Sequence, residues 1–128
     1  MYQHPGHLKY TATHEWVRDE GRGLVTVGIT DHAQSVLGEV VCVELPESGV
    51  DVGQGEDIAV VESVKTAADV YSPLNGTIEA VNEQLVVDPG LLNRDPYGDG
   101  WLYQIRMSDE AQFEALLDVA DYENDLGD

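Results

Sequence analysis

Short runs of β-branched and other apolar residues alternate with polar residues along most of the chain, and Gly, Pro, Asn and Asp interrupt them. Alternation with a period of two is typical of strands, because successive side chains of a strand point to opposite faces of a sheet. The pattern predicts strands over residues 15–17, 24–29, 40–45, 58–62, 67–71, 77–81 and 101–107. "LPESG", "SPLNG" and "DPYGDG" are predicted turns, since Pro presets one backbone angle and Gly or Asn accepts positive φ. The chain is therefore predicted to be mainly β.

Two segments depart from this alternation and predict helices. "TDHAQSVLG" offers Thr30 or Asp31 as an N-cap and Gly38 as a stop, which indicates a short helix between strands. Residues 108–126 offer Ser108 as a cap, acidic residues in the first turn and an apolar stripe at helical spacing. The stripe consists of Phe113, Leu116, Leu117 and Ala120. We expect it to pack on the sheet rather than to bind a partner.

The composition indicates one acidic domain. The chain has 128 residues, enough for a single core, and we treat residues 1–128 as one folded unit. Its 25 Asp and Glu residues against six Lys and Arg give a formal net charge of -19. The phosphates of nucleic acid and an anionic membrane surface would repel this charge, so we expect neither as a partner. The even spread of acids and the scarcity of lysine favour a halophilic source; an ordinary solvated acidic surface is the alternative.

The remaining conspicuous residues are predicted to be structural. Cys42 is the single cysteine, which excludes an internal disulfide and leaves no second thiol for a Cys-based metal site. We expect Cys42 to be a small buried residue of its strand, and we predict no metal site. Trp16 and Trp101 are expected to anchor core or rim packing. No segment matches a signal peptide or a membrane span, which favours a cytoplasmic protein.

One lysine raises a question of function. The chain has only two lysines, and Lys65 lies in "AVVESVKTAADVY" between two predicted strands. Residues 63–66 contain no Gly, Pro or Asn, so a reversal here must be a type I turn, and Lys65 is then exposed at the tip of a hairpin. A catalytic lysine usually needs burial or a cationic neighbour, whereas Glu62 and Asp69 are acids. An acceptor of covalent acylation need only be reachable, and a solubilising charge is the plain alternative.

Four segments of the chain, including the one that contains Lys65, resemble a known family. "VVESVKTAADVYSPLNGTIEAVNEQL" is similar to the lipoyl-attachment hairpin of the glycine cleavage system H proteins, with Lys65 at the lipoylated position. "KYTATHEWV", "VGITDHAQSVLGEVVCVELPESG" and "DPYGDGWLYQIRMSD" also match the pattern of that family. Several long motifs are more specific than one short motif. Related carrier domains typically have Met-Lys-Met or Asp-Lys-Ala at this turn, and this chain has neither.

The resemblance implies a non-catalytic carrier with lipoate bound covalently to Lys65. In this family the lipoyl group receives the aminomethyl group of glycine from the P protein (glycine decarboxylase) and delivers it to the T protein (aminomethyltransferase). The L protein (dihydrolipoyl dehydrogenase) reoxidises the arm, and a lipoate ligase or a lipoyl or octanoyl transferase modifies the lysine. The implied fold is a flattened β-barrel or sandwich of the lipoyl-domain (barrel-sandwich hybrid) type, with a short internal helix, a C-terminal helix and a lipoyl-binding core over residues 24–106.

The resemblance also implies further site residues. The attachment motif around the lysine consists of Glu62, Ser63, Val64 and Thr66. A loaded arm is expected to fold against a cleft that limits access of water, where an acid could pair with the ammonium of the adduct. That acid is Glu15, with Thr13 and Asp69 nearby; a capped turn and solvated carboxylates are the plain alternatives. Some family members place a histidine late in the short helix, where this chain has Val36.

Two other interpretations stay open. An H-like protein that relays octanoyl or lipoyl groups to other complexes would have the same hairpin sequence. An unmodified β-sandwich binding module would have Lys65 exposed without further use. An enzyme is not expected, because the sequence shows no nucleophile with a base, no metal cluster and no phosphate-binding glycine loop.

Overall fold

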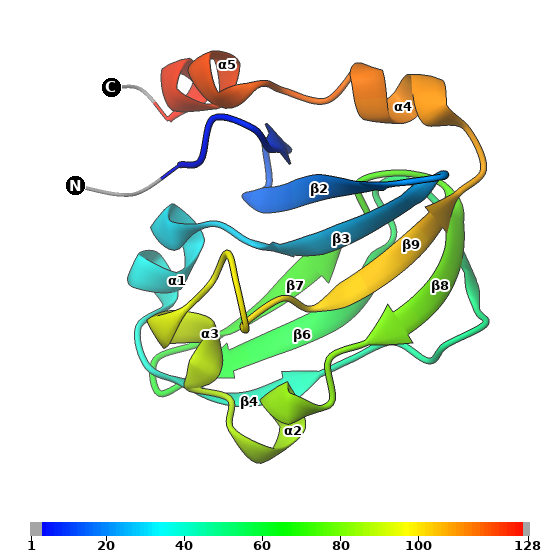
Figure 1. Cartoon of the computed structure of the whole chain (residues 1–128). Helices are drawn as coiled ribbons and strands as arrows, with labels where there is room; N and C mark the ends of the chain where they lie inside the picture. The colour runs from blue at the N-terminus through cyan, green and yellow to red at the C-terminus, as the bar shows by residue number, and fades with distance from the viewer. Residues whose placement is uncertain (1–3, 127–128) are drawn as a thin grey trace.

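The computed structural model describes residues 4–126 and consists of two antiparallel sheets that pack face to face (Figure 1). One sheet has six strands in the order β1-β2-β3-β9-β8-β5, and the other has three in the order β4-β6-β7. The strands are β1 (Lys9–Tyr10), β2 (Glu15–Gly21), β3 (Leu24–Ile29), β4 (Val40–Glu44), β5 (Asp51–Val52), β6 (Asp57–Ser63), β7 (Ala67–Tyr71), β8 (Gly76–Val81) and β9 (Tyr103–Met107). The prediction of a mainly β sandwich is confirmed.

Every predicted strand is present, and only the ends differ. The largest difference is in β2, which continues to Gly21 with a register shift between Asp19 and Gly21. The sequence pattern missed β1 and β5, because a strand of two residues is too short to show alternation. The ends of the single unit expected from the sequence, residues 1–3 and 127–128, lie outside the described residues.

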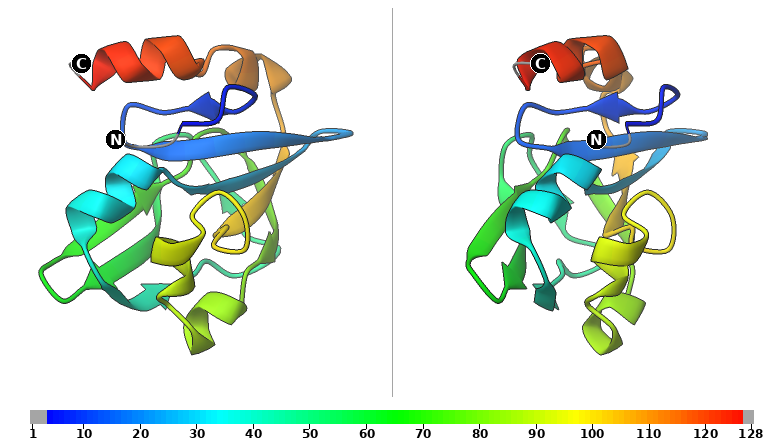
Figure 2. Two further views of the ribbon diagram at one scale, coloured as in Figure 1. Left: turned by 60° about the vertical axis from the view of Figure 1, so that its left-hand side comes forward. Right: turned by 90° about the vertical axis from the view of Figure 1, so that its left-hand side faces the viewer.

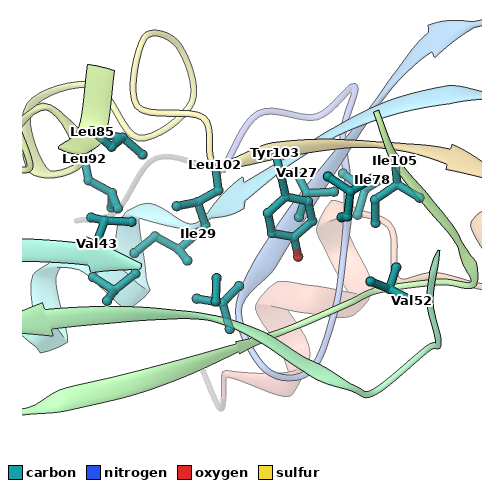
Figure 3. Close-up of a cluster of buried hydrophobic side chains, with 14 of the residues drawn as sticks. Val27, Ile29, Val43, Val52, Ile78, Leu85, Leu92, Leu102, Tyr103 and Ile105 are labelled. Carbon is teal, nitrogen blue, oxygen red and sulfur yellow. The ribbon is translucent and has the colours of Figure 1, made fainter. Parts of the chain in front are cut away.

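The main core lies between the two sheets (Figure 3). Val27, Ile78 and Ile105 from the six-stranded sheet and Val43 and Val61 from the three-stranded sheet are all buried in it. Fully burying a side chain of this size stabilises the fold by about 1.5–3 kcal/mol. The two sheets are therefore held together by aliphatic contact.

A second hydrophobic cluster lies beside β1 and β2 of the six-stranded sheet, separate from the main core. Trp16, Tyr10 and Tyr122 have no exposed surface and are its centre. Trp101 packs against them partly buried, so the prediction that both tryptophans anchor packing is confirmed. The indole N–H of Trp16 donates to the carbonyl of Pro96 at 2.9 Å. This cluster joins the N-terminal and C-terminal segments to the sheet.

The predicted internal helix is present as α1 (Asp31–Leu37). Thr30 is its N-cap, and the Thr30 hydroxyl accepts a hydrogen bond from the backbone N–H of Ala33. Gly38 ends the helix with a φ of 80° and a ψ of -153°, a conformation that is essentially restricted to glycine. The cap and stop residues read from the sequence therefore define this helix correctly.

Two further short helices, α2 (Gln84–Val87) and α3 (Leu91–Arg94), were not predicted. Four residues are too few to show a helical period. Leu85 and Leu92 from these helices are fully buried and fill one end of the core beside Leu102 (Figure 3). Among the helices of residues 4–126, none is long and apolar enough to cross a membrane.

The prediction of one C-terminal helix starting at Ser108 is wrong. The segment forms two helices, α4 (Glu110–Glu114) and α5 (Val119–Asp125). Their N-caps are Asp109 and Asp118, whose carboxylates accept hydrogen bonds from backbone N–H groups in the first turn. Each aspartate provides the acceptor that Ser108 was expected to provide.

The break between the two helices has a backbone cause. Leu117 and Tyr10 exchange two backbone hydrogen bonds with N···O distances of 2.7 and 2.9 Å. This pairing requires extended backbone at Leu117 and cannot be continued as a helix. Phe113 and Leu116 do pack on the main core and Leu117 on the second cluster, as expected for the apolar stripe, whereas Ala120 is exposed.

The prediction that Cys42 is buried is also wrong. Alternation within β4 would place Cys42 on the same face as Val40, which is buried. A register shift between Val40 and Cys42 in the pairing with β6 moves the alternation by one residue. Val43 is therefore buried instead, and the thiol is exposed.

Candidate functional site

The turn that joins β6 to β7 carries Lys65. The backbone N–H of Ser63 donates to the carbonyl of Thr66 at 2.7 Å, and the Ser63 hydroxyl accepts from the N–H groups of Lys65 and Thr66 at 3.1 and 3.2 Å. Among the described non-glycine residues, positive φ occurs only at His14 and Arg22. The turn thus closes without glycine, as the sequence predicts, because the Ser63 side chain satisfies two turn N–H groups.

The tip of this hairpin is exposed and rests against the end of α1 (Figure 2, left). The N–H of Val64 donates to the carbonyl of Glu39 at 3.0 Å, which attaches the tip to the connection after α1. The Lys65 side chain passes over Gly38, where an added Cβ would lie 3.0 Å from the lysine Cε. Gly38 therefore ends the helix and also leaves room for the lysine.

We expect Gly38→Ala to disturb both roles of this glycine. The backbone conformation at Gly38 should make alanine unfavourable by about 2 kcal/mol, and the new methyl group should push the Lys65 side chain away. Gly49→Ala is the matched control, because Gly49 also has positive φ but has no neighbour within 4 Å of the added Cβ. Acylation of Lys65 by a lipoate ligase should slow in Gly38→Ala and not in Gly49→Ala. Equal rates would show that Gly38 does not shape the access to Lys65.

A cleft of about 190 Å³ lies between α1, the β6–β7 hairpin and the turn that joins β1 to β2; we call it the α1 cleft. Its polar lining residues are Thr13, His14, Glu15, His32 and Asp69, and its other lining residues are apolar. All three residues expected to line the arm cleft therefore border one hollow beside the lysine hairpin. The volume is below the roughly 300 Å³ typical of drug-sized ligand pockets and suits a slender chain.

Glu15 is the buried acid of this cleft. It is 1% exposed, and its Oε1 accepts hydrogen bonds from the hydroxyls of Thr11 and Thr13 at 2.5 and 2.6 Å. The backbone N–H of Tyr71 donates to Oε2 at 3.1 Å. Burial raises the pKa of the Glu15 carboxyl above its usual range, although these hydrogen bonds act in the opposite direction. Thr13 and Asp69 are exposed at the surface, so only Glu15 is held inside.

The raised pKa of Glu15 predicts how its contribution to stability changes with pH. A carboxyl whose pKa is higher in the folded state stabilises the fold most below its unfolded pKa, and this contribution falls as the pH rises through the folded pKa. The unfolding free energy of the wild type minus that of Glu15→Gln should therefore decrease between pH 4 and neutral pH. Denaturant titrations of both proteins over this range measure it. A difference that grows with pH would contradict the conclusion that burial raises the pKa of Glu15.

Sequence reasoning missed two histidines of the cleft. His14 and His32 both line it, and their ring centroids lie 4.8 Å apart. They stand within the segments "KYTATHEWV" and "TDHAQSVLG", but nothing in those segments shows that two histidines 18 positions apart meet in space. Val36, which is 59% exposed, also lines the cleft at the place where some family members are expected to have a histidine.

These features define a class of protein. A two-sheet sandwich that presents one lysine at an exposed hairpin tip, beside a narrow cleft with a buried acid, has the architecture of a carrier domain. Comparisons with known proteins agree with this class. Residues 8–128 match the family model described as "Glycine cleavage H-protein". The chain therefore belongs to the glycine cleavage H-protein family.

Relatives and a solved structure support this membership over the whole fold. Glycine cleavage system H proteins of Alteromonas mediterranea and Klebsiella pneumoniae are each 56% identical to this chain, covering 95% and 97% of it and 95% and 96% of their own lengths. The crystal structure of an H protein from Mycobacterium marinum is 40% identical with a TM-score of 0.87, covering 97% of this chain and 99% of that one. Proteins of this family are non-catalytic carriers of the glycine cleavage system and bear a lipoyl group on a lysine.

Proposed function

We propose that Lys65 bears the lipoyl group and that the loaded arm lies in the α1 cleft. The observation that carries this proposal is the position of Lys65, exposed at the tip of a hairpin that itself forms one wall of the cleft. The other lysine, Lys9, lies in β1 and not in the hairpin that walls the α1 cleft. Residues 24–106 form the lipoyl-binding core in this proposal, and β1 and β2 add the wall that contains Glu15.

The residues of the hairpin fit a covalently bound arm. Lys65 is exposed, and the Ser63 hydroxyl fixes the turn by accepting hydrogen bonds from the backbone N–H groups of Lys65 and Thr66. Glu62 pairs with Ala67 at the base of the turn, while Val64 and Thr66 are exposed beside the lysine. A ligase or transferase can therefore reach the amine while the strands on both sides stay in place.

The proposed role is to carry the aminomethyl group of glycine from the P protein to the T protein, with reoxidation by the L protein. The lipoyl group, when bound, supplies the disulfide that accepts the aminomethyl group. The chain itself supplies position and shelter. Tethering gives a high effective concentration at each partner's active site. The narrow α1 cleft, whose lining is largely apolar, limits the access of water to the arm. The carboxylate of Glu15 offers a buried negative charge to an ammonium group.

A reconstituted assay tests this role. Lipoylated chain, supplied with P, T and L proteins of a relative, should support release of CO₂ from glycine and formation of methylene-tetrahydrofolate, and unmodified chain should not. A lipoylated chain that is inert with all three partners but donates its acyl group to another carrier would favour the relay of octanoyl or lipoyl groups instead.

The net charge of -19 leads to a prediction about partner binding. At 1 M salt the Debye length is about 3 Å, which is too short for surface charge to steer encounters. We expect docking to depend on shape and apolar contact, so affinity for the P protein should change little between moderate and high salt. A steep loss of affinity over that range would show that charge pairs dominate the contact.

A further inference from the structure

One tyrosine hydroxyl connects the C-terminal helix to two walls of the α1 cleft. Tyr122 of α5 is fully buried, and its ring stacks on Tyr10 with 4.7 Å between centroids. The Tyr122 hydroxyl lies 2.7 Å from His14 Nδ1 and 2.8 Å from Thr30 Oγ1. His14 lines the cleft, and Thr30 is the N-cap of α1, which forms another wall. In Figure 1, α5 lies over the N-terminal segment from which His14 comes.

His14 holds an unusual backbone conformation. Its φ is 74°, in the left-handed region that is unfavourable for residues with a Cβ. The backbone on both sides is fixed, because the N–H of His14 donates to Thr11 O at 3.2 Å and its carbonyl accepts from Thr30 N at 3.0 Å. The contact of its ring with Tyr122 adds a third attachment. Such a conformation persists only where the surroundings determine it.

This conformation has a consequence for the neighbouring residues. His14 stands between Thr13 and Glu15, and the left-handed turn lets the Thr13 hydroxyl reach back to Glu15 Oε1 at 2.6 Å. The Thr11 hydroxyl reaches the same oxygen and also accepts from the N–H of Glu15. Two of the donors that hold the carboxylate thus depend on the path of the chain through His14.

The chemistry of the His14 contact supports a fixed orientation. Burial, and next the neighbouring His32, lower the pKa of His14 below 6.5, so the imidazole is neutral at neutral pH. A neutral ring can leave Nδ1 without a proton, so that it accepts the hydrogen of the Tyr122 hydroxyl. Thr30 can then donate to the tyrosine oxygen, which completes a chain of hydroxyl hydrogen bonds.

We propose that His14 and Tyr122 are positioning residues for the Glu15 carboxylate, so that the C-terminal helix sets the geometry of the buried acid in the α1 cleft. The use of the cleft by a loaded arm rests on the proposed function. The positioning itself is a property of the unmodified chain and can be measured without lipoate.

Nuclear magnetic resonance on the unmodified chain provides two readouts. The amide hydrogen of Tyr71 reports on the carboxylate, because Glu15 Oε2 accepts from it. In Tyr122→Phe and in His14→Ala, we expect this amide to exchange with solvent about tenfold faster, the effect of losing one hydrogen bond to a charged group. We also expect the pKa of the Glu15 carboxyl to rise further, because loss of the Thr13 hydrogen bond removes an interaction that lowers it.

Tyr10→Phe is the matched control. It removes a hydroxyl from the same stacked pair, but that hydroxyl donates to Pro5 O at 2.6 Å and not to His14. Tyr10→Phe should leave the Tyr71 amide and the Glu15 titration as in the wild type. The proposal is overturned if Tyr122→Phe lowers the melting temperature without moving either readout, or if Tyr10→Phe moves both equally. Lipoylation of Tyr122→Phe and Tyr10→Phe, whose changed residues do not line the α1 cleft, should proceed as in the wild type. Failure in both variants and in the wild type would count against the proposed function alone.

Discussion

Lys65→Arg is expected to reduce lipoylation of the chain to background and to abolish its support of glycine cleavage. A guanidinium stays protonated at all accessible pH values, so it cannot attack an activated acyl group as an amine does. Arginine keeps the charge and the length of the lysine, and Lys65 is exposed, so the fold should be unchanged. Intact mass after incubation with a lipoate ligase, lipoate and ATP measures the first effect, and CO₂ release from glycine measures the second.

The chain offers its own control for this experiment. Lys9 is the other lysine of the sequence and lies in β1, paired with Val17. Lys9→Arg should be lipoylated and active to the same extent as the wild type. If Lys65→Arg kept its activity while Lys9→Arg lost it, the site would have been assigned to the wrong lysine.

Gly28→Ala is expected to produce the largest loss of stability among single methyl additions near the site. Gly28 of β3 pairs with Trp16 of β2, and the indole lies over the glycine. An added Cβ would stand 2.6 Å from three ring atoms, and the ring cannot move freely because Trp16 has no exposed surface. Overpacking of this kind costs about 3 kcal/mol, or roughly 10 °C in melting temperature for a chain of this size.

Gly53→Ala separates this steric effect from the general effect of adding a methyl group. The nearest atoms to an added Cβ at Gly53 are 3.8 Å away, which is ordinary contact. Thermal unfolding of both variants should therefore show a large shift for Gly28→Ala and a shift of at most a few degrees for Gly53→Ala. Similar melting temperatures would mean that Trp16 can repack. Because Trp16 follows Glu15 directly, the carboxyl titration in Gly28→Ala would then show how far such repacking reaches.

The sequence predicted those parts of the fold whose pattern repeats over several residues. Alternation located the long strands, and Thr30 with Gly38 located α1, because caps and periodicity are local properties. The C-terminal prediction failed because Leu117 is pulled into pairing with Tyr10, more than 100 positions away. The position of Cys42 failed because a bulge in β4 shifts the alternation by one residue. In both cases a contact distant in sequence overrides the local pattern.

In the candidate site, too, local features could be predicted from the sequence, whereas contacts between distant residues could not. Lys65 could be selected from its place between two strands and from the resemblance of its segment to a family. The grouping of Thr13, Glu15 and Asp69 around one cleft came from that resemblance, and the three do border one cleft in the structure. His14 could not be found in this way, because its left-handed backbone and its contact with Tyr122, 108 positions along the chain, exist only in the folded protein.

The most direct test of the account is to locate the acyl group on the chain. The wild type is incubated with a lipoate ligase, lipoate and ATP, digested with a protease that cleaves at acidic residues, and the peptides are analysed by mass spectrometry. The account predicts one lipoyl group, on the peptide that contains Lys65 and on no other. Absence of modification under conditions that lipoylate a known acceptor, or modification at Lys9, would contradict it.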